Sequence, residues 1–433
     1  MPTDRLAASE LTTSLPATSR LNAGQWLVLG AALLGWMFDG AEMGLFTAVG
    51  RPALQDLLGS AAVDEHNIAQ WFSYLTAAFL LGAACGGLIF GWLGDRIGRV
   101  RSMAISIFMY SLFTGACYFA AEPWQLAVLR FAAALGMGGE WALGVALVVE
   151  CWPERFRTLL AGVIGAAGNL GYLAIALVVA IGRVTPDAWR WTMLVCTAPA
   201  LLAFIVLAYL PESQRWQRSV RESVARPIRE IFTTHLIQPT LLAIGLASVA
   251  LIGTWGCVQA FLPTWADQMG GRLDPPDPSA KGWTLVAVAI GAICGGFVAP
   301  LVGGRIGRRK AYFGMCVASL VVCQALFRVL PEVYNGWFLL MAGIAGFCTA
   351  SFYGWLPLYL PELFPTRVRA TAQGVSFNFG RIFAAAGALG TGSLMGLFDR
   401  SYPRACATMS LVYVIGMILI WFGPETRGQP LPE

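Results

Sequence analysis

The sequence predicts an all-α membrane protein with twelve transmembrane helices, arranged as two six-helix halves around a central cavity. Of its 433 residues, 57% are hydrophobic and only 12% are charged, and the mean hydropathy is +0.65. A soluble domain carries about 25% charged residues. Apolar runs long enough to cross a hydrocarbon core of about 30 Å alternate with short charged or Gly/Pro-rich segments. This composition excludes an ordinary soluble enzyme.

The predicted spans follow one another along the whole chain. Each is a mostly apolar run of about 20 residues, bounded by charged residues, glycine or proline. The spans are 25–47, 70–92, 103–121, 125–149, 158–180, 191–210, 240–263, 283–302, 311–330, 338–358, 371–396 and 405–422.

Polar segments divide the chain into five parts. The N-terminal segment contains no apolar run that ends in a small-residue cleavage site, so we expect a short tail and no signal peptide. The parts are a cytoplasmic N-terminal tail at 1–24, a first half at 25–210, a basic cytoplasmic linker at 211–239, a second half at 240–422 and a cytoplasmic C-terminal tail at 423–433.

The distribution of Lys and Arg predicts the orientation. Nineteen of the 29 basic residues lie in segments on the same side as the N-terminus, eight lie on the other side and two lie inside spans. The side rich in Lys and Arg is normally cytoplasmic. We therefore expect a multi-pass protein of the cell inner membrane with both termini in the cytoplasm. The net charge of +5 reflects this bias, so no nucleic-acid partner is expected.

Cysteine and histidine form no pattern typical of a metal site. The ten cysteines fall in or beside apolar spans without a CxxC pair, and His66 and His235 lie in separate segments between spans. The sequence predicts no metal, no cofactor and no disulfide.

An internal repeat relates the two halves. The segment Gly82–Gly87, continuing to Gly94–Arg99, recurs 209 residues later as Gly291–Gly296 and Gly303–Arg308. Farther along, Glu150-Cys-Trp-Pro-Glu-Arg-Phe-Arg157 recurs 212 residues later as Glu362-Leu-Phe-Pro-Thr-Arg-Val-Arg369. Parallel halves of this kind place a substrate site near the bilayer midplane between them.

Three motifs carry a resemblance to a known family. Gly91–Arg99 resembles the loop signature of the major facilitator superfamily, Pro211–Trp216 resembles its motif after the sixth helix, and Pro424–Gly428 resembles its terminal motif. The resemblance implies a transporter that works by alternating access. In the second loop Gly304 replaces the acidic residue that Asp95 supplies in the first, so we expect the stronger gate contacts from the first half.

Further segments resemble particular groups within that superfamily. Arg130, Gly136–Trp141, Glu150–Pro153, Phe261–Trp265 and Tyr359–Pro365 are similar to the sialate and monocarboxylate proton symporters.

Two other segments bear on the substrate. Asp39–Glu42 resembles the DGxD motif of the aromatic-acid proton symporters, with Glu in place of the second Asp. The QQxSG pattern of the sugar porters is absent from the seventh span, which has Trp255-Gly-Cys-Val-Gln-Ala. The resemblance therefore implies an organic acid and a proton as substrates.

Ionisable residues inside the spans are candidate proton-coupling sites, because a charge in hydrocarbon is costly unless it pairs or faces a water-filled cavity. Asp39 lies well inside the first span, and Glu42 shares its helical face. Arg130 enters the fourth span to a comparable depth, so we expect it to pair with Asp39. In sugar porters such a pair carries the proton switch. Glu140 lies on another face of the same span and is a second proton-site candidate.

Charged residues near the repeated loops are candidate gate residues. They lie where the cytoplasmic ends of the two halves meet. The set is Asp95, Arg96, Arg99, Glu150, Arg157, Arg305, Arg308, Glu362 and Arg369.

Arg381 is the candidate anion-binding residue. It lies ten residues after Thr371, or about 15 Å into the eleventh span, which is half the depth of the core. Its spacing after Arg369 also resembles organic-anion transporters of the superfamily. Asn378 shares its face. Other candidate cavity residues are Trp141, Tyr172, Trp255, Gln259, Phe261, Tyr353 and Trp355.

These observations predict a monomeric symporter that moves a small organic anion with protons across a lipid bilayer. A sugar or polyol symporter and a proton-driven efflux antiporter remain alternatives. No nucleotide-binding GxxxxGK[ST] loop occurs, so ATP does not drive transport. A membrane enzyme or a sensor is disfavoured, because the chain has no catalytic cluster and no soluble output domain.

Overall fold

The computed structural model describes residues 22–62, 65–181, 185–222, 226–233, 235–259, 261–389, 398 and 401–433. Most of the predicted tail 1–24 and the end of the predicted span 371–396 beyond Leu389 lie outside these residues. Within the described ranges every regular element is a helix.

The described residues of the first half and the linker form ten α-helices. In chain order they are α1 (Ala23–Ala62), α2 (Glu65–Ile97), α3 (Arg99–Ala116), α4 (Pro123–Met137), α5 (Glu140–Cys151), α6 (Arg157–Ile181), α7 (Trp189–Val195), α8 (Ala200–Tyr209), α9 (Gln214–Glu222) and α10 (Pro227–Ile231). The last two lie in the predicted linker.

The second half follows. Its helices are α11 (Ile237–Gly253), a π-helical segment (Thr254–Gln259), α12 (Phe261–Gly270), α13 (Ala280–Ile306), α14 (Arg308–Gln324), α15 (Gly336–Leu363), α16 (Arg369–Leu389), α18 (Tyr402–Met409) and α19 (Val412–Leu419).

Eleven stretches in the described part of the chain are long and apolar enough to cross a membrane. Helix α16 is the twelfth. It is more polar than the others because it carries the buried residues Thr371, Gln373, Ser376, Asn378 and Arg381. The structure thus agrees with an all-α protein of twelve spans.

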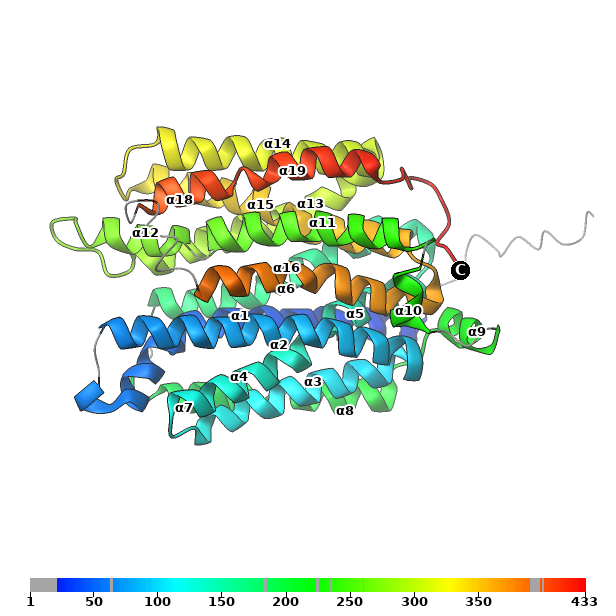
Figure 1. The fold of residues 1–433 in the computed structure, drawn as a ribbon, viewed down its shortest axis with the longest axis horizontal. Coiled ribbons are helices and arrows are strands. Elements are labelled where there is room, and N and C mark those ends of the chain that lie inside the picture. The colour runs from blue at the N-terminus through cyan, green and yellow to red at the C-terminus, as the bar shows by residue number, and fades with distance from the viewer. Residues whose placement is uncertain are drawn as a thin grey trace, which may run out of the picture.

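The two halves lie side by side with their helices along the long axis of the molecule (Figure 1). They meet where α2 packs along α16 and where α6 packs along α13. Helices α9 and α10 and the C-terminus lie at one end of the bundle (Figure 1). That end carries Asp95, Arg99, Glu150, Arg308 and Glu362, and we call it the motif end.

The fourth span is two helices rather than the continuous one predicted at 125–149. Helix α4 ends at Met137 and α5 begins at Glu140. At the break, Gly138 packs against the backbone carbonyl of Ala83 in α2, which leaves no room for a side chain. The break places Glu140 at the start of α5, in the middle of the bundle.

Candidate functional site

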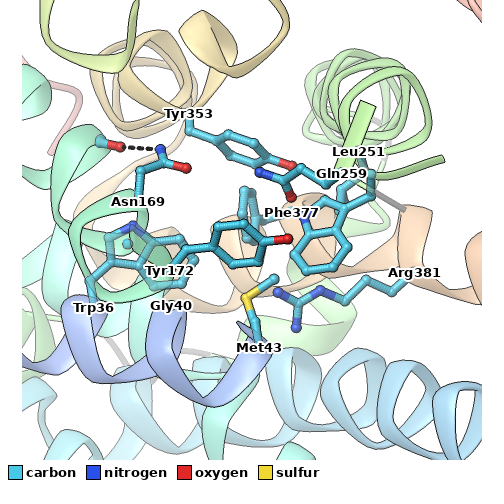
Figure 2. Close-up of a pocket in the computed structure, with 13 residues that line it drawn as sticks. Trp36, Gly40, Met43, Asn169, Tyr172, Leu251, Gln259, Tyr353, Phe377 and Arg381 are labelled. Carbon is cyan, nitrogen blue, oxygen red and sulfur yellow. Dashed lines mark hydrogen bonds between the residues drawn. The ribbon is translucent and has the colours of Figure 1, made fainter. Parts of the chain in front are cut away.

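A cavity lies between the two halves, in the interior of the bundle (Figure 2). Helices α1 and α6 line it from the first half, and α11, the π-helical segment, α15 and α16 line it from the second. The lining residues are Trp36, Gly40, Met43, Gly165, Gly168, Asn169, Tyr172, Leu251, Trp255, Gln259, Tyr353, Phe377 and Arg381.

Five residues of this lining were predicted from the sequence, and the other lining residues were not. Tyr172, Trp255, Gln259, Tyr353 and Arg381 were expected there. The missed residues are apolar or small, apart from Asn169, whose amide donates to Gly165 O at 3.4 Å. Their hydrophobicity is ordinary for a transmembrane helix, so only the rotation of each helix shows which of them face the cavity.

Arg381 brings a positive charge into the cavity. Its side chain is only 2% exposed, and Nη1 has no hydrogen bond partner among the described residues. The guanidinium lies 5.8 Å from the ring centre of Phe377, one turn earlier on α16. Figure 2 shows it extending toward Met43 of α1. A buried guanidinium with an unused Nη1 group is suited to an anionic partner.

The carboxyl groups of Asp39 and Glu140 face each other near this arginine. Both residues are almost fully buried. They interact with each other, and Asp39 also interacts electrostatically with Arg381. Neither carboxyl meets the geometry of a hydrogen bond with any described residue. Two buried carboxylates in contact strongly disfavour a double negative charge, so the pair is suited to hold a proton.

Gly35 makes room for Glu140 against α1. A Cβ atom at Gly35 would collide with Glu140 Oε1. Gly35 lies one turn before Asp39, so the carboxyl of Glu140 reaches the face of α1 that carries Asp39.

Arg130 pairs with Glu42, so the expected pair with Asp39 is wrong. One Nη of Arg130 donates to Glu42 Oε1, and its guanidinium lies 4.6 Å from the ring centre of Phe79. Depth along each helix was compatible with either carboxylate. In the structure Arg130 of α4 reaches Glu42, one turn beyond Asp39 on α1.

Four predicted cavity residues do not line the cavity. Asn378 donates to Gly138 O at 2.8 Å and to Gly374 O at 2.9 Å, so it faces α2 and the α4–α5 break. Phe261 packs on Tyr402, and Trp355 packs on Tyr312 and Tyr359 within the second half. Trp141 lies behind Phe377, with the two rings stacked at 4.0 Å.

At the motif end, the first half binds the start of α16. Asp95 accepts hydrogen bonds from Thr371 N at 2.8 Å, Thr371 Oγ1 at 2.6 Å and Ala370 N at 3.2 Å. It also forms a 3.0 Å ion pair with Arg99. An acidic group at a helix N-terminus is favourable, because it accepts from unpaired N–H groups and opposes the helix dipole.

Glu150 extends this network across the two halves. It binds Arg99 of its own half at 3.1 Å and Arg369 of α16 at 3.0 Å. Arg99 in turn donates to Thr366 O at 2.7 Å. All these side chains are buried, so the network holds the halves together at this end.

The second half repeats the network with one difference. Glu362 binds Arg308 of its own half at 2.8 Å and Arg157 of the first half at 2.8 Å. Gly304, however, supplies no carboxylate, and it packs against Thr158 at the start of α6. The contacts are therefore lopsided in the predicted direction, with Asp95 holding α16 and no counterpart at Gly304 holding α6.

Two further glutamates cap the helices that follow the loops. Glu212 accepts from the N–H groups of Arg99 and Val100, and Glu425 accepts from those of Arg308 and Arg309. Burial raises the pKa of Glu212 despite these bonds. Burial is slighter at Glu425, where the backbone donors outweigh it and lower the pKa. Each capped helix begins directly after a glycine with positive φ, Gly98 before α3 and Gly307 before α14. This backbone conformation favours glycine.

The last residues of the chain lie across the motif end, which sequence reasoning missed. Arg369 donates to Pro432 O at 2.7 Å, and Arg157 donates to Gln429 O at 3.4 Å. Leu431 is buried. Of the other predicted gate residues, Arg96 and Arg305 are exposed and lie outside the buried network.

Asp95→Asn should loosen the motif end. The change removes a buried charge that faces Arg99 and the start of α16, and breaking such a pair typically costs about 3–5 kcal/mol. About 1.4 kcal/mol is a factor of ten in an equilibrium. We therefore expect the cysteine of Ala370→Cys, a fully buried position facing α2, to react with N-ethylmaleimide about tenfold faster or more in the Asp95→Asn background, and transport to slow.

Asp56→Asn is the matched control for this measurement. Asp56 also forms an ion pair, with Arg190 at 2.9 Å, but it lies toward the C-terminal end of α1 and its side chain is 37% exposed. Alkylation should be followed by mass spectrometry of the peptide that contains position 370. Equal rates in the Asp95→Asn and Asp56→Asn backgrounds would show that Asp95 does not hold the motif end closed.

Comparisons with known proteins agree with this architecture. A family model described as Major Facilitator Superfamily matches residues 27–388. The cis,cis-muconate transport protein of Acinetobacter baylyi is 30% identical over 88% of this chain and 91% of its own length.

Two further matches cover nearly the whole chain. A putative metabolite transport protein of Haemophilus influenzae is 29% identical over 96% of this chain and 100% of its own length. The solved structure of the proton:xylose symporter XylE covers 94% of this chain and 97% of its own with a TM-score of 0.75, at 17% identity. The last likeness concerns the fold alone.

Proposed function

The chain belongs to the major facilitator superfamily, and from this premise we propose that it is a symporter that carries a small organic anion together with protons by alternating access. The family makes the chain a multi-pass membrane transporter and not an enzyme. The proposal concerns the substrate and the coupling ion.

One observation carries the proposal: Arg381 stands buried in the cavity with an N–H group unpaired, near the carboxyl pair of Asp39 and Glu140. A cation held in this way needs an anionic partner, because an uncompensated charge is costly in a low-dielectric interior. An ionised Asp39 can supply that partner when the cavity is empty. A substrate carboxylate can supply it when Asp39 is protonated.

This exchange of partners would couple the two substrates. Protonating Asp39 removes the negative charge that competes for Arg381, so proton and anion binding favour each other. The site then holds the same net charge empty as it does when loaded with one proton and one carboxylate. A transporter whose conformational equilibrium depends on that charge would change sides readily in these two states and poorly in the others.

The walls of the cavity favour a planar substrate. Its aromatic residues are Trp36, Tyr172, Trp255, Tyr353 and Phe377. Polar groups are few, chiefly the two tyrosine hydroxyls, Gln259 and Asn169 (Figure 2). A polyhydroxylated ligand would leave many hydroxyl groups unpaired there, whereas a flat unsaturated body can stack on the rings. The muconate that names the Acinetobacter relative has such a body.

The cell inner membrane is the proposed location, with the motif end in the cytoplasm and the protein as a monomer. The excess of Lys and Arg in the segments at this end supports the orientation. The closed network at the motif end then corresponds to a state that is shut toward the cytoplasm.

Transport by the purified protein in liposomes tests the proposal. With the outside more acidic, we expect accumulation of nicotinate and cis,cis-muconate above protein-free liposomes, weaker transport of lactate and sialate, and none of xylose or nicotinamide. Uptake of xylose without uptake of any acid would instead support the sugar symporter. Expulsion of the acids as protons enter would support the antiporter.

A further inference from the structure

We infer that Trp141 is a positioning residue that couples the carboxyl pair to the opening of the motif end, through its stack on Phe377. The inference rests on the proposed function, since it assigns the carboxyl pair to proton binding. It gives a role to the aromatic cluster of Trp36, Trp141, Tyr353 and Phe377, three of which line the cavity.

The stack joins the two halves of the protein. Trp141 lies on α5 in the first half, and Phe377 lies on α16 in the second. Their ring centres are 4.0 Å apart with an angle of 14° between the planes, and both side chains are buried. Face-to-face contact of this kind depends on the relative position of the two helices, so it is lost when the helices separate.

Each ring of the stack is attached to one of the charged sites. Trp141 follows Glu140 directly in α5. Phe377 precedes Arg381 by one turn of α16, and the guanidinium lies 5.8 Å from its ring centre. Trp36, three residues before Asp39 on α1, contacts both rings, at 6.4 Å from Trp141 and 6.0 Å from Phe377. The rings therefore adjoin both the residues of the carboxyl pair and Arg381.

The cluster forms part of the cavity wall, and Phe377 lies nearer than Arg381 to the motif end. Helix α16 starts at Arg369 in the motif-end network, so Phe377 is about 12 Å along it and Arg381 about 18 Å. Tyr353 also belongs to the cluster, with its ring centre 6.2 Å from that of Phe377. Opening the motif end requires α5 and α16 to part, and the stack resists this movement at the depth of the carboxyl pair.

A shift of Glu140 would act on the stack. The carboxyl of Glu140 fills the space that Gly35 leaves on α1 and faces Asp39. Among the described residues, Tyr110, Glu42 and Arg381 also interact electrostatically with this pair. A change in its charge moves Glu140 relative to α1, and the adjoining Trp141 transmits the movement to Phe377. Packed aromatic rings suit this role, because they have discrete arrangements and little freedom in between.

A double-mutant cycle tests the inference without a transported substrate. The cysteine of Ala370→Cys reports opening of the motif end by its rate of alkylation with N-ethylmaleimide at one fixed pH. Glu140→Gln mimics the protonated carboxyl. We expect Glu140→Gln to change the alkylation rate about fivefold or more in the parent, and less than about twofold when Trp141→Leu is also present.

Matched variants separate coupling from simple packing. Trp141→Phe keeps an aromatic ring and should restore most of the response to Glu140→Gln, and Phe377→Leu should abolish it as Trp141→Leu does. Trp355→Leu removes another fully buried tryptophan, whose ring packs on Tyr312 and Tyr359 of the second half, and should leave the response intact.

Three outcomes would overturn the inference. They are an equal response to Glu140→Gln with and without Trp141, no response in the parent, and loss of the response in Trp355→Leu as well. None of these depends on which molecule is transported. Failure of the liposome assay with an intact cycle would contradict the proposed substrate and leave the coupling role in place.

Discussion

Replacing Asp39 with Asn should abolish accumulation driven by a pH gradient while exchange of substrate across the membrane survives. Asn cannot release or bind a proton under these conditions, so a proton gradient can no longer drive the carrier. Counterflow exchange needs no net proton movement and depends on Arg381, which stays in place. Both rates can be measured in the same liposomes with the acid that the parent transports best.

The affinity for substrate gives a second readout of the same variant. An ionised Asp39 competes with the substrate for Arg381, so the KM of the parent should rise as the pH rises. In Asp39→Asn that competition is absent, and the KM for counterflow should be no higher than in the parent and nearly independent of pH. Uphill transport retained by Asp39→Asn would exclude Asp39 as the coupling site and direct attention to Glu140.

Replacing Arg381 with Ala should raise the KM for the transported acid by tens-fold or more. Loss of one partner from a buried charge pair typically costs about 2–5 kcal/mol, and about 1.4 kcal/mol is a factor of ten. Arg381→Lys should recover only part of the loss, because an ammonium group is a point charge and lacks the planar fork. The measurement is the concentration dependence of counterflow in liposomes.

The amide of the same acid is the control for the role of Arg381. The parent should strongly prefer the acid to its amide, because only the acid carries a negative charge that can pair with Arg381. Arg381→Ala should lose most of that preference. If it binds acid and amide with the preference of the parent, Arg381 does not recognise the carboxylate, and the assignment of an organic anion loses its main support.

The two variants change different quantities, and this separates the roles. Asp39→Asn should remove the coupling of transport to the pH gradient and spare the affinity for substrate. Arg381→Ala should instead lower the affinity for the ionised acid. A general loss of folding would lower both together. Gly35→Ala offers a third comparison, since a side chain there must displace the carboxyl of Glu140 from α1 without removing any charge.

Much of the architecture could be predicted from the sequence. Membrane spans are recognisable because each must be apolar over a length set by the bilayer. The repeat at Gly94–Arg99 and Gly303–Arg308 predicted two related halves, and the structure has the same buried Arg–Glu pairs at the same end of each. The depth of Arg381 followed from the constant rise of an α-helix, and this residue does lie in the cavity.

Pairing between helices was decided only by the tertiary structure. Position along a helix gives a residue's depth and its face, but the rotation of one helix against another determines which faces meet. Asp39 and Glu42 were both compatible with Arg130 in depth, but helix packing pairs Arg130 with Glu42 and leaves Glu140 opposite Asp39. Helix packing also turns Asn378 toward Gly138 at the α4–α5 break and brings Trp141 onto Phe377. These contacts join residues far apart in the chain, and no local pattern of the sequence specifies them.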